Sequence, residues 1–135
     1  MRIIVDANVL VSAAIRTGPS HRIVQAWLRE GAFEVVACPQ LLAEVRDVLT
    51  QRPRLRRWID LEAAETFLAT LETYATIVPD PVEVPAETRD PEDDYLIAVA
   101  RAHGIDHIVT GDQDLLAWDG PPGLVITPAQ FEALG

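Results

Sequence analysis

The 135-residue chain carries 21 acidic residues against 11 basic ones, which gives a net charge of −10. All eleven bases are arginine, so the chain lacks the lysine that a P-loop places on its phosphates and that Schiff-base catalysis uses as a nucleophile. This acidic balance argues against binding nucleic acid by broad electrostatic attraction, and it is compatible with a cation site or a basic protein partner.

The rest of the composition indicates one globular domain over residues 1–135. Hydrophobic residues make up 49% of the chain, which is ordinary for a globular protein and sufficient for a core. No apolar stretch reaches the length of a membrane span, and Asp6 interrupts the N-terminal apolar run too early for a signal peptide. The lone cysteine, Cys38, fits a reducing, cytoplasmic setting.

The first half of the chain alternates between short apolar runs and helical patterns. Residues 3–5 predict a buried strand, and a Gly-Pro turn then leads to a helix at 21–30 with Ser20 as its N-cap. A second strand at 33–37 precedes a helix at 39–50 that has proline in its first turn. This alternation is typical of strand–helix–strand units with parallel strands.

The second half repeats the alternation. Asp60 is predicted to cap a helix that runs to Tyr74, and the proline-rich residues 79–89 read as a surface loop. The remaining predicted elements are strands at 76–78, 105–110 and 124–126, a helix from Asp90 to His103, a helical piece around Leu115, and a capping box from Thr127 to Gln130. The whole pattern predicts an α/β fold, with a parallel sheet of about four to five strands and helices on both faces.

Several acids fall where such a fold places ligands. Asp6 follows a buried strand, at the carboxyl edge where open α/β sheets bind ligands, although an aspartate there also serves as a helix cap. Asp112 follows the strand at 105–110 in the same way, with Asp114 as a supporting or solvated residue. Glu44 lies between Leu41 and Val48 on its helix, either within the apolar stripe or at its border.

Three acids compete for one role at the start of the helix that follows Arg89. Asp90 precedes proline and fits an N-cap, and Asp93 in the first turn favours the helix dipole. Asp94 shares its helix face with Ile97 and Ala98, so we expect it to point towards packed structure. On this periodicity Asp94 is the preferred functional acid of the three.

A cluster of carboxylates without lysines needs a cation to offset its own repulsion. Oxygen ligands suit Mg²⁺ or Mn²⁺, which keep several waters and bind phosphate groups. Zinc is disfavoured because Cys38 stands alone and the three histidines lack metal-ligand spacing. The acids therefore predict a magnesium or manganese site.

Four stretches, in order along nearly the whole chain, resemble the motifs of PIN domains. They are Asp6-Ala7-Asn8-Val9-Leu10, Leu41-Leu42-Ala43-Glu44-Val45, Asp94-Tyr95-Leu96-Ile97-Ala98 and Val109-Thr110-Gly111-Asp112-Gln113-Asp114-Leu115. The segments RDPEDD and TGDQDL resemble most closely the branch of VapC-like toxins from toxin–antitoxin pairs. Cys38 departs from the serine or threonine that more commonly caps the second motif's helix.

The resemblance implies a metal-dependent endoribonuclease on a Rossmann-like sheet, which cleaves RNA phosphodiester bonds with water activated by the metal. By analogy Asp6, Glu44, Asp94 and Asp112 form the catalytic and metal-binding pocket, and Asn8, Thr110 and Asp114 orient ligands or water. It also implies an antitoxin that blocks the pocket, and homodimerisation. The alternative is a PIN-like module that binds RNA or an antitoxin without turnover.

Five arginines are candidates for contact with RNA phosphates or with a partner: Arg46, Arg52, Arg54, Arg56 and Arg57. The competing interpretation is that they form salt bridges with the many surface acids.

Overall fold

The computed structural model covers Met1–Gly135 and contains a parallel five-stranded sheet. Its strands are β1 (Arg2–Val5), β2 (Glu34–Ala37), β3 (Thr76–Ile77), β4 (His107–Val109) and β5 (Val125–Ile126). They lie in the order β3-β2-β1-β4-β5. The chain therefore adds β2 and β3 on one side of β1, and then adds β4 and β5 on the other side. This arrangement confirms the predicted α/β class and places a topological switch point between β1 and β4.

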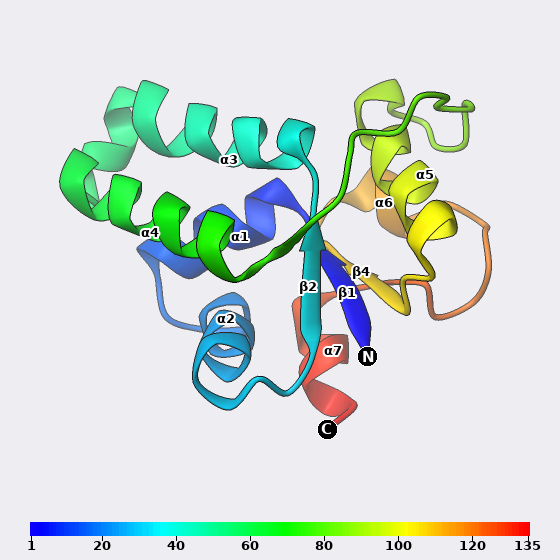
Figure 1. Ribbon diagram of the computed structural model, residues 1–135, viewed down its shortest axis with the longest axis horizontal. Helices are drawn as coiled ribbons and strands as arrows, with labels where there is room; N and C mark the ends of the chain where they lie inside the picture. The colour runs from blue at the N-terminus through cyan, green and yellow to red at the C-terminus, as the bar shows by residue number, and fades with distance from the viewer.

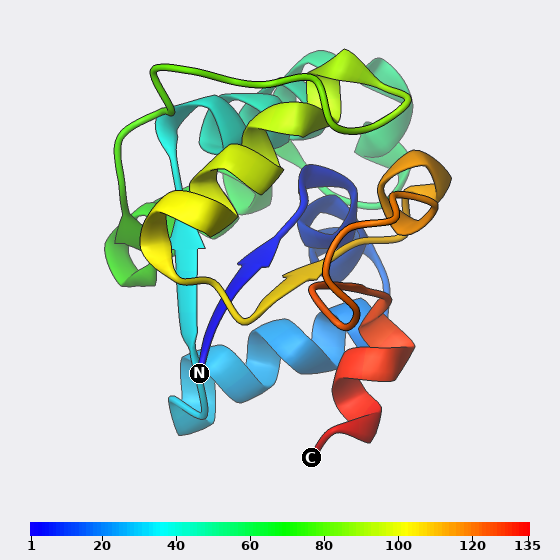
Figure 2. The same ribbon diagram turned by 90° about the vertical axis from the view of Figure 1, so that its right-hand side faces the viewer.

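Helices cover both faces of the sheet, as predicted. They are α1 (Ala7–Ile15), α2 (Pro19–Glu30), α3 (Pro39–Gln51), α4 (Leu61–Tyr74), α5 (Asp94–His103), α6 (Gln113–Leu116) and α7 (Pro128–Ala133), with 3₁₀ turns η1 (Pro53–Arg57) and η2 (Pro91–Asp93). Figure 1 shows α1 to α4 on one side of the strands and α5 and α6 on the other, and Figure 2 shows α5 crossing in front of the sheet.

The two central strands are buried because both of their faces are covered. Ile4 of β1 pairs with Ile108 of β4, and Val5 pairs with Val109; each of these four side chains is at most 1% exposed. A continuous apolar run is what a doubly covered parallel strand requires. No helix in the structure is both long enough and apolar enough to cross a bilayer.

The structure differs from the sequence prediction at the starts of α1, α2 and α5, the last of which begins at Asp94 instead of Asp90. Helix α1 begins directly after Asp6, although no helix was predicted there. Val9, Leu10 and Val11 are all buried, so the polar face of this helix is narrower than the face that marks a surface helix. Helix α2 begins at Pro19 after Gly18, so Ser20 is not its N-cap. Asp60, by contrast, caps α4 as predicted, and the capping box at Thr127 is present.

Candidate active site

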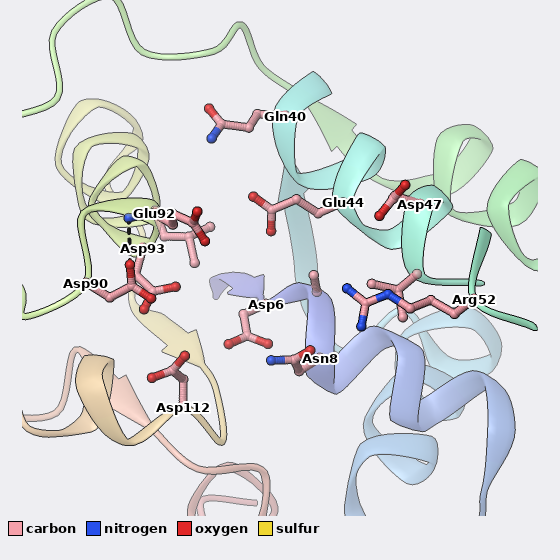
Figure 3. Close-up of a pocket in the computed structure, with 13 residues that line it drawn as sticks. Asp6, Asn8, Gln40, Glu44, Asp47, Arg52, Asp90, Glu92, Asp93 and Asp112 are labelled. Carbon is pink, nitrogen blue, oxygen red and sulfur yellow. Dashed lines mark hydrogen bonds between the residues drawn. The ribbon is translucent and has the colours of Figure 1, made fainter. Parts of the chain in front are cut away.

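An acidic cavity of about 560 Å³ opens at the carboxyl ends of β1 and β4, beside the switch point. Figure 3 shows carboxylates entering it from the junction of β1 and α1, from α3, from the η2 turn and from the loop after β4. The lining residues are Asp6, Ala7, Asn8, Gln40, Glu44, Asp47, Val48, Arg52, Asp90, Glu92, Asp93, Leu96 and Asp112. Seven of them are acids and one is a base, so the cavity concentrates negative charge that the protein does not neutralise.

Asp6 lines this cavity between Glu44 and Asp112 (Figure 3) and is 5% exposed. Its Oδ1 accepts a hydrogen bond of 3.1 Å from the backbone N–H of Val9, so it also caps α1. Burial raises the pKa of Asp6, which the hydrogen bonds from Thr110 and the backbone partly oppose and the charge of Asp112 reinforces. The same side chain therefore caps α1 and lines the cavity, and its hydrogen bonds with Val9 and Thr110 fix its orientation.

Thr110 connects Asp6 to Asp112. This fully buried hydroxyl donates to Oδ2 of Asp6 and accepts a 2.9 Å hydrogen bond from the backbone N–H of Asp112. Oδ1 of Asp112 in turn accepts from the backbone N–H of Asp114 at 2.7 Å. Asp114 itself does not line the cavity, and its Oδ1 lies 3.3 Å from Nε of Arg89. The β4 end thus positions two of the predicted acids, and Asp114 supports them from outside.

Glu44 faces Asp6 across the cavity from α3 (Figure 3). Burial is the largest cause that raises its pKa, and the charges of Asp6 and Glu92 add to it. The neighbouring Tyr95 hydroxyl is the one influence that lowers the pKa of Glu44. Tyr95 is 3% exposed, and burial is the largest cause that raises the pKa of its hydroxyl, followed by the charge of Glu44.

Asp93 is the acid of the η2 turn that best fits a functional role. Its side chain lines the cavity, and its Oδ2 is buried with no hydrogen-bond partner. Burial raises its pKa to about 7, with the charges of Asp112, Asp90 and Asp6 as further causes. An acid that is desolvated and surrounded by other acids, without an ion pair, is typical of a functional site.

Asp94, which the sequence interpretation preferred, does not line the cavity. It is 3% exposed, and its Oδ1 accepts hydrogen bonds of 2.8 and 2.7 Å from the backbone N–H and hydroxyl of Thr88. It therefore points towards packed structure as expected, and it ties the preceding loop to the start of α5. Asp90 lines the cavity and also caps the η2 turn, accepting from the backbone N–H of Glu92 at 3.0 Å.

The reason for this correction is local backbone geometry. Residues 91–93 form a 3₁₀ turn before the α-helix begins at Asp94. Asp94 lies within the α-helix, so it follows the α-helical spacing and faces packed structure with Ile97. Asp93 ends the 3₁₀ turn, which has 3.0 residues per turn instead of 3.6, so α-helical spacing does not predict where its side chain points. We therefore assign the cavity position to Asp93 and a loop-anchoring role to Asp94.

The predicted arginines do not act as one patch. Arg46 pairs with Glu65 at 2.8 Å and with Glu72 at 3.4 Å, and Arg56 donates to the backbone carbonyl of Leu49. Arg52 alone among the five lines the acidic cavity, reaching towards it from the end of α3 (Figure 3). Arg54 and Arg57 form no ion pair and lie outside the cavity.

Three polar lining residues were not predicted from the sequence: Gln40, Asp47 and Glu92. Gln40 and Asp47 lie four residues before and three residues after Glu44 on α3, so helical spacing from Glu44 identifies both. Asn8 was predicted, and it lies exposed on the first turn of α1 beside Asp6 (Figure 3).

The oxygen-only donors of the cavity fit a hydrated Mg²⁺ or Mn²⁺ ion. As the side chains lie, no three acidic, histidine or cysteine side chains are close enough together to hold one ion directly. Mg²⁺ commonly binds through one or two carboxylates and keeps its remaining waters, so a tighter cage is not required. The unpartnered Oδ2 of Asp93 is a buried oxygen that such an ion or one of its waters would satisfy.

The fold is shared with solved structures of low sequence identity. "Crystal structure of PAE2754 from Pyrobaculum aerophilum" aligns with a TM-score of 0.65 and 22% identity, over 99% of this chain and 88% of that one. VapBC2 from Rickettsia felis, bound to a DNA fragment from its promoter, aligns with a TM-score of 0.63 and 12% identity, over 94% and 98%. Mycobacterium tuberculosis VapC20 (Rv2549c), described as a sarcin-ricin loop cleaving toxin, aligns with a TM-score of 0.57 and 17% identity, over 86% and 95%.

Family membership rests on a sequence match as well as on the fold. No curated protein matches the chain. The pattern described as "PIN domain", however, matches residues 2–114, which include every acid of the cavity. The chain therefore belongs to the PIN domain family.

Proposed function

We propose that this protein is a metal-dependent endoribonuclease and the toxin component of a toxin–antitoxin pair, acting on RNA in the cytoplasm. The observation that carries the proposal is the meeting of Asp6, Glu44, Asp93 and Asp112 in one cavity that has a single arginine to offset them. Unpaired carboxylates at this density need a cation. The phosphate oxygens of a nucleic acid backbone can bind the same cation as the carboxylates, so a phosphodiester is a fitting substrate.

Asp6, Asp93 and Asp112 would hold the hydrated ion, partly through its waters, with Glu44 facing them from α3. Mg²⁺ or Mn²⁺, when bound, polarises the attacked phosphate and makes water a better nucleophile. The protein's part is positioning: Thr110 fixes Asp6 relative to Asp112 through its hydroxyl. The raised pKa of Glu44 makes its carboxylate a stronger base than a solvated glutamate, which suits it to accept a proton from the attacking water.

Cleavage of a fluorescent single-stranded RNA in the presence and absence of Mn²⁺ tests the catalytic part. We expect the wild type to cut the RNA with Mn²⁺ and to stop when the metal is chelated, and Asp6→Asn to be inactive. Asparagine still caps a helix, so α1 keeps its N-terminal hydrogen bond in this variant. Asp119→Asn is the matched control because Asp119 is exposed and outside the cavity.

The competing function is a module that binds RNA or an antitoxin without turnover. Wild-type protein that binds the RNA in Mn²⁺ but leaves it intact would establish that function and reject the catalytic one. Thermal unfolding of each variant separates a lost activity from a lost fold.

The toxin part of the proposal is supported by the fold shared with VapBC2 and VapC20. It predicts that the protein arrests growth when expressed alone and that the product of the neighbouring gene relieves the arrest. If cells that express the active protein grow as well as cells that express the Asp6→Asn variant, the toxin part of the proposal is rejected and the function is limited to RNA cleavage.

A further inference from the structure

A second groove adjoins the acidic cavity and has the opposite charge. Its volume is about 410 Å³, and three of its lining residues, Asn8, Val48 and Arg52, also line the cavity. Beyond them its polar side chains are those of Arg16, Arg54 and Ser12. No acidic residue lines this groove. We call it the arginine groove.

The arginines of this region are unpaired in a protein that has acids to spare. Five of the eleven arginines form ion pairs with acidic side chains, and six do not. Of those six, only Arg29 lies elsewhere, at the end of α2. The other five follow α1 or belong to the segment after α3: Arg16, Arg52, Arg54, Arg56 and Arg57. Arg56 donates to the backbone carbonyl of Leu49, and the other four have no such partner. Unpaired guanidinium groups concentrated on one side of a protein of net charge −10 indicate an anionic ligand.

Trp58 lines the arginine groove and is 53% exposed. It follows the η1 turn, and the guanidinium of Arg57 lies 5.3 Å from the centroid of its ring. A tryptophan is costly to leave in water, because its apolar area is large. An exposed aromatic ring among arginines is the arrangement on which proteins stack unpaired bases, whereas phosphate contacts alone do not require a ring.

We propose that the arginine groove binds a single RNA strand that continues into the acidic cavity, with phosphates on Arg16, Arg52 and Arg54 and one unpaired base stacked on Trp58. The inference rests on the proposed function for the cleavage step, and it specifies the substrate as RNA that is single-stranded on this side of the cut. Arg52 lines both hollows, so the strand passes from the groove to the acids at this residue.

The structure favours a nucleic acid strand over a base-paired helix or an acidic protein segment. A base inside a duplex is already stacked, so Trp58 could not receive it. An acidic segment of a partner would pair with the arginines but would not require the ring of Trp58. Arg46 lies outside the groove, in ion pairs with α4, so it is not part of the proposed track.

The test is fluorescence anisotropy of a short labelled RNA of mixed, non-self-complementary sequence, titrated with protein at several salt concentrations. The protein carries Asp6→Asn, so that the RNA stays intact, and Mn²⁺ is present. In this background we compare Trp58→Ala, Trp58→Phe and Arg54→Ala. The matched controls are Tyr74→Ala, which removes another exposed aromatic ring, and Arg29→Ala, which removes the unpaired arginine outside the groove.

We expect Trp58→Ala to weaken binding about tenfold with an unchanged salt slope, because a stacking partner is lost and no charge is removed. Trp58→Phe should retain much of the affinity. Arg54→Ala should reduce the slope of log affinity against log salt by about 0.7, the contribution of one phosphate contact to a single strand. Duplex RNA of the same length should compete poorly.

Affinity that is unchanged in both Trp58→Ala and Arg54→Ala overturns the inference, as does equal competition by the duplex. The same holds if these variants lose only the binding of the neighbouring gene's protein product, since the groove then serves a protein partner. Loss of RNA binding in the variants supports the groove even if the wild type cuts no RNA, in which case only the proposed catalytic function fails.

Discussion

The acidic cavity and the arginine groove are neighbours that share three residues and carry opposite charge. Of the six arginines outside this region, five form ion pairs, as Arg22 does with Glu132 and Arg46 with Glu65. At these two sites the charges stay apart: the acids belong to the carboxyl edge of the sheet, and the arginines to the turns beyond α1 and α3. Unpaired charge contributes little to stability, so its concentration at two adjoining hollows is better explained by ligands that supply the missing counter-charges.

The largest expected effect is a difference in cleavage rate between variants of Asp93 and variants of its neighbour Asp94. If the cavity uses Asp93, Asp93→Asn should lower the Mn²⁺-dependent cleavage rate on the order of a hundredfold, as the loss of groups that hold or orient a metal does. Asp94→Asn should leave the rate close to that of the wild type, because the asparagine oxygen can still accept both hydrogen bonds from Thr88. Initial cleavage rates of the two variants measure the difference.

The reverse pattern, with Asp94→Asn inactive and Asp93→Asn active, would return the catalytic role to the residue that sequence periodicity preferred. Asp94→Ala adds a control for structure. It removes the acceptor for Thr88, so it should destabilise the loop before α5 and lower the melting temperature, which Asp93→Asn should not do.

A smaller effect is expected on the pH dependence of stability, which the acidic cavity alters in the metal-free protein. The pKa of Asp93 rises from an ordinary 3.8 to about 7 on folding. Between these pH values the folded protein holds a proton that the unfolded chain has released, so the free energy of unfolding falls as pH rises through this window. Asp93 is partly exposed, and solvent screening limits the contribution to on the order of 1 kcal/mol.

Urea unfolding at several pH values within this window measures that contribution. Asp93→Asn should flatten the decline in the free energy of unfolding, whereas Asp119→Asn should leave the decline as it is in the wild type. Identical pH dependence in the wild type and Asp93→Asn would mean that Asp93 is not desolvated in the way the cavity suggests.

Much of this architecture follows from the sequence. Ile3, Ile4 and Val5 form the continuous apolar run that a doubly covered strand requires, and Asp6 at its end marks the ligand-binding edge. The same reasoning places Asp112 at this edge, and Asp112 lines the cavity. Glu44 lines it too, but helical spacing alone left its side chain either within the apolar stripe or at its border. The helix α1 escaped prediction because a helix buried on most sides has no amphipathic pattern.

The sequence could not separate the roles of the arginines, because pairing depends on contacts between distant segments. Arg46 and Arg54 look equivalent in the chain, yet α4 presents Glu65 to the first and no acid to the second. The role of Trp58 has the same origin: only the fold brings the η1 turn beside α1 and the cavity. Contacts between segments that are distant in the sequence cannot be predicted from local sequence patterns.

The most direct test of the central claim is a calorimetric titration of Mn²⁺ into the metal-free protein, without RNA. The claim is that the cavity acids, Asp93 among them, form a divalent-cation site. We predict a saturable binding isotherm for the wild type and for Asp119→Asn, and an affinity at least about tenfold weaker for Asp93→Asn. A wild type that binds no Mn²⁺, or an Asp93→Asn variant that binds it as tightly as the wild type does, would contradict the claim.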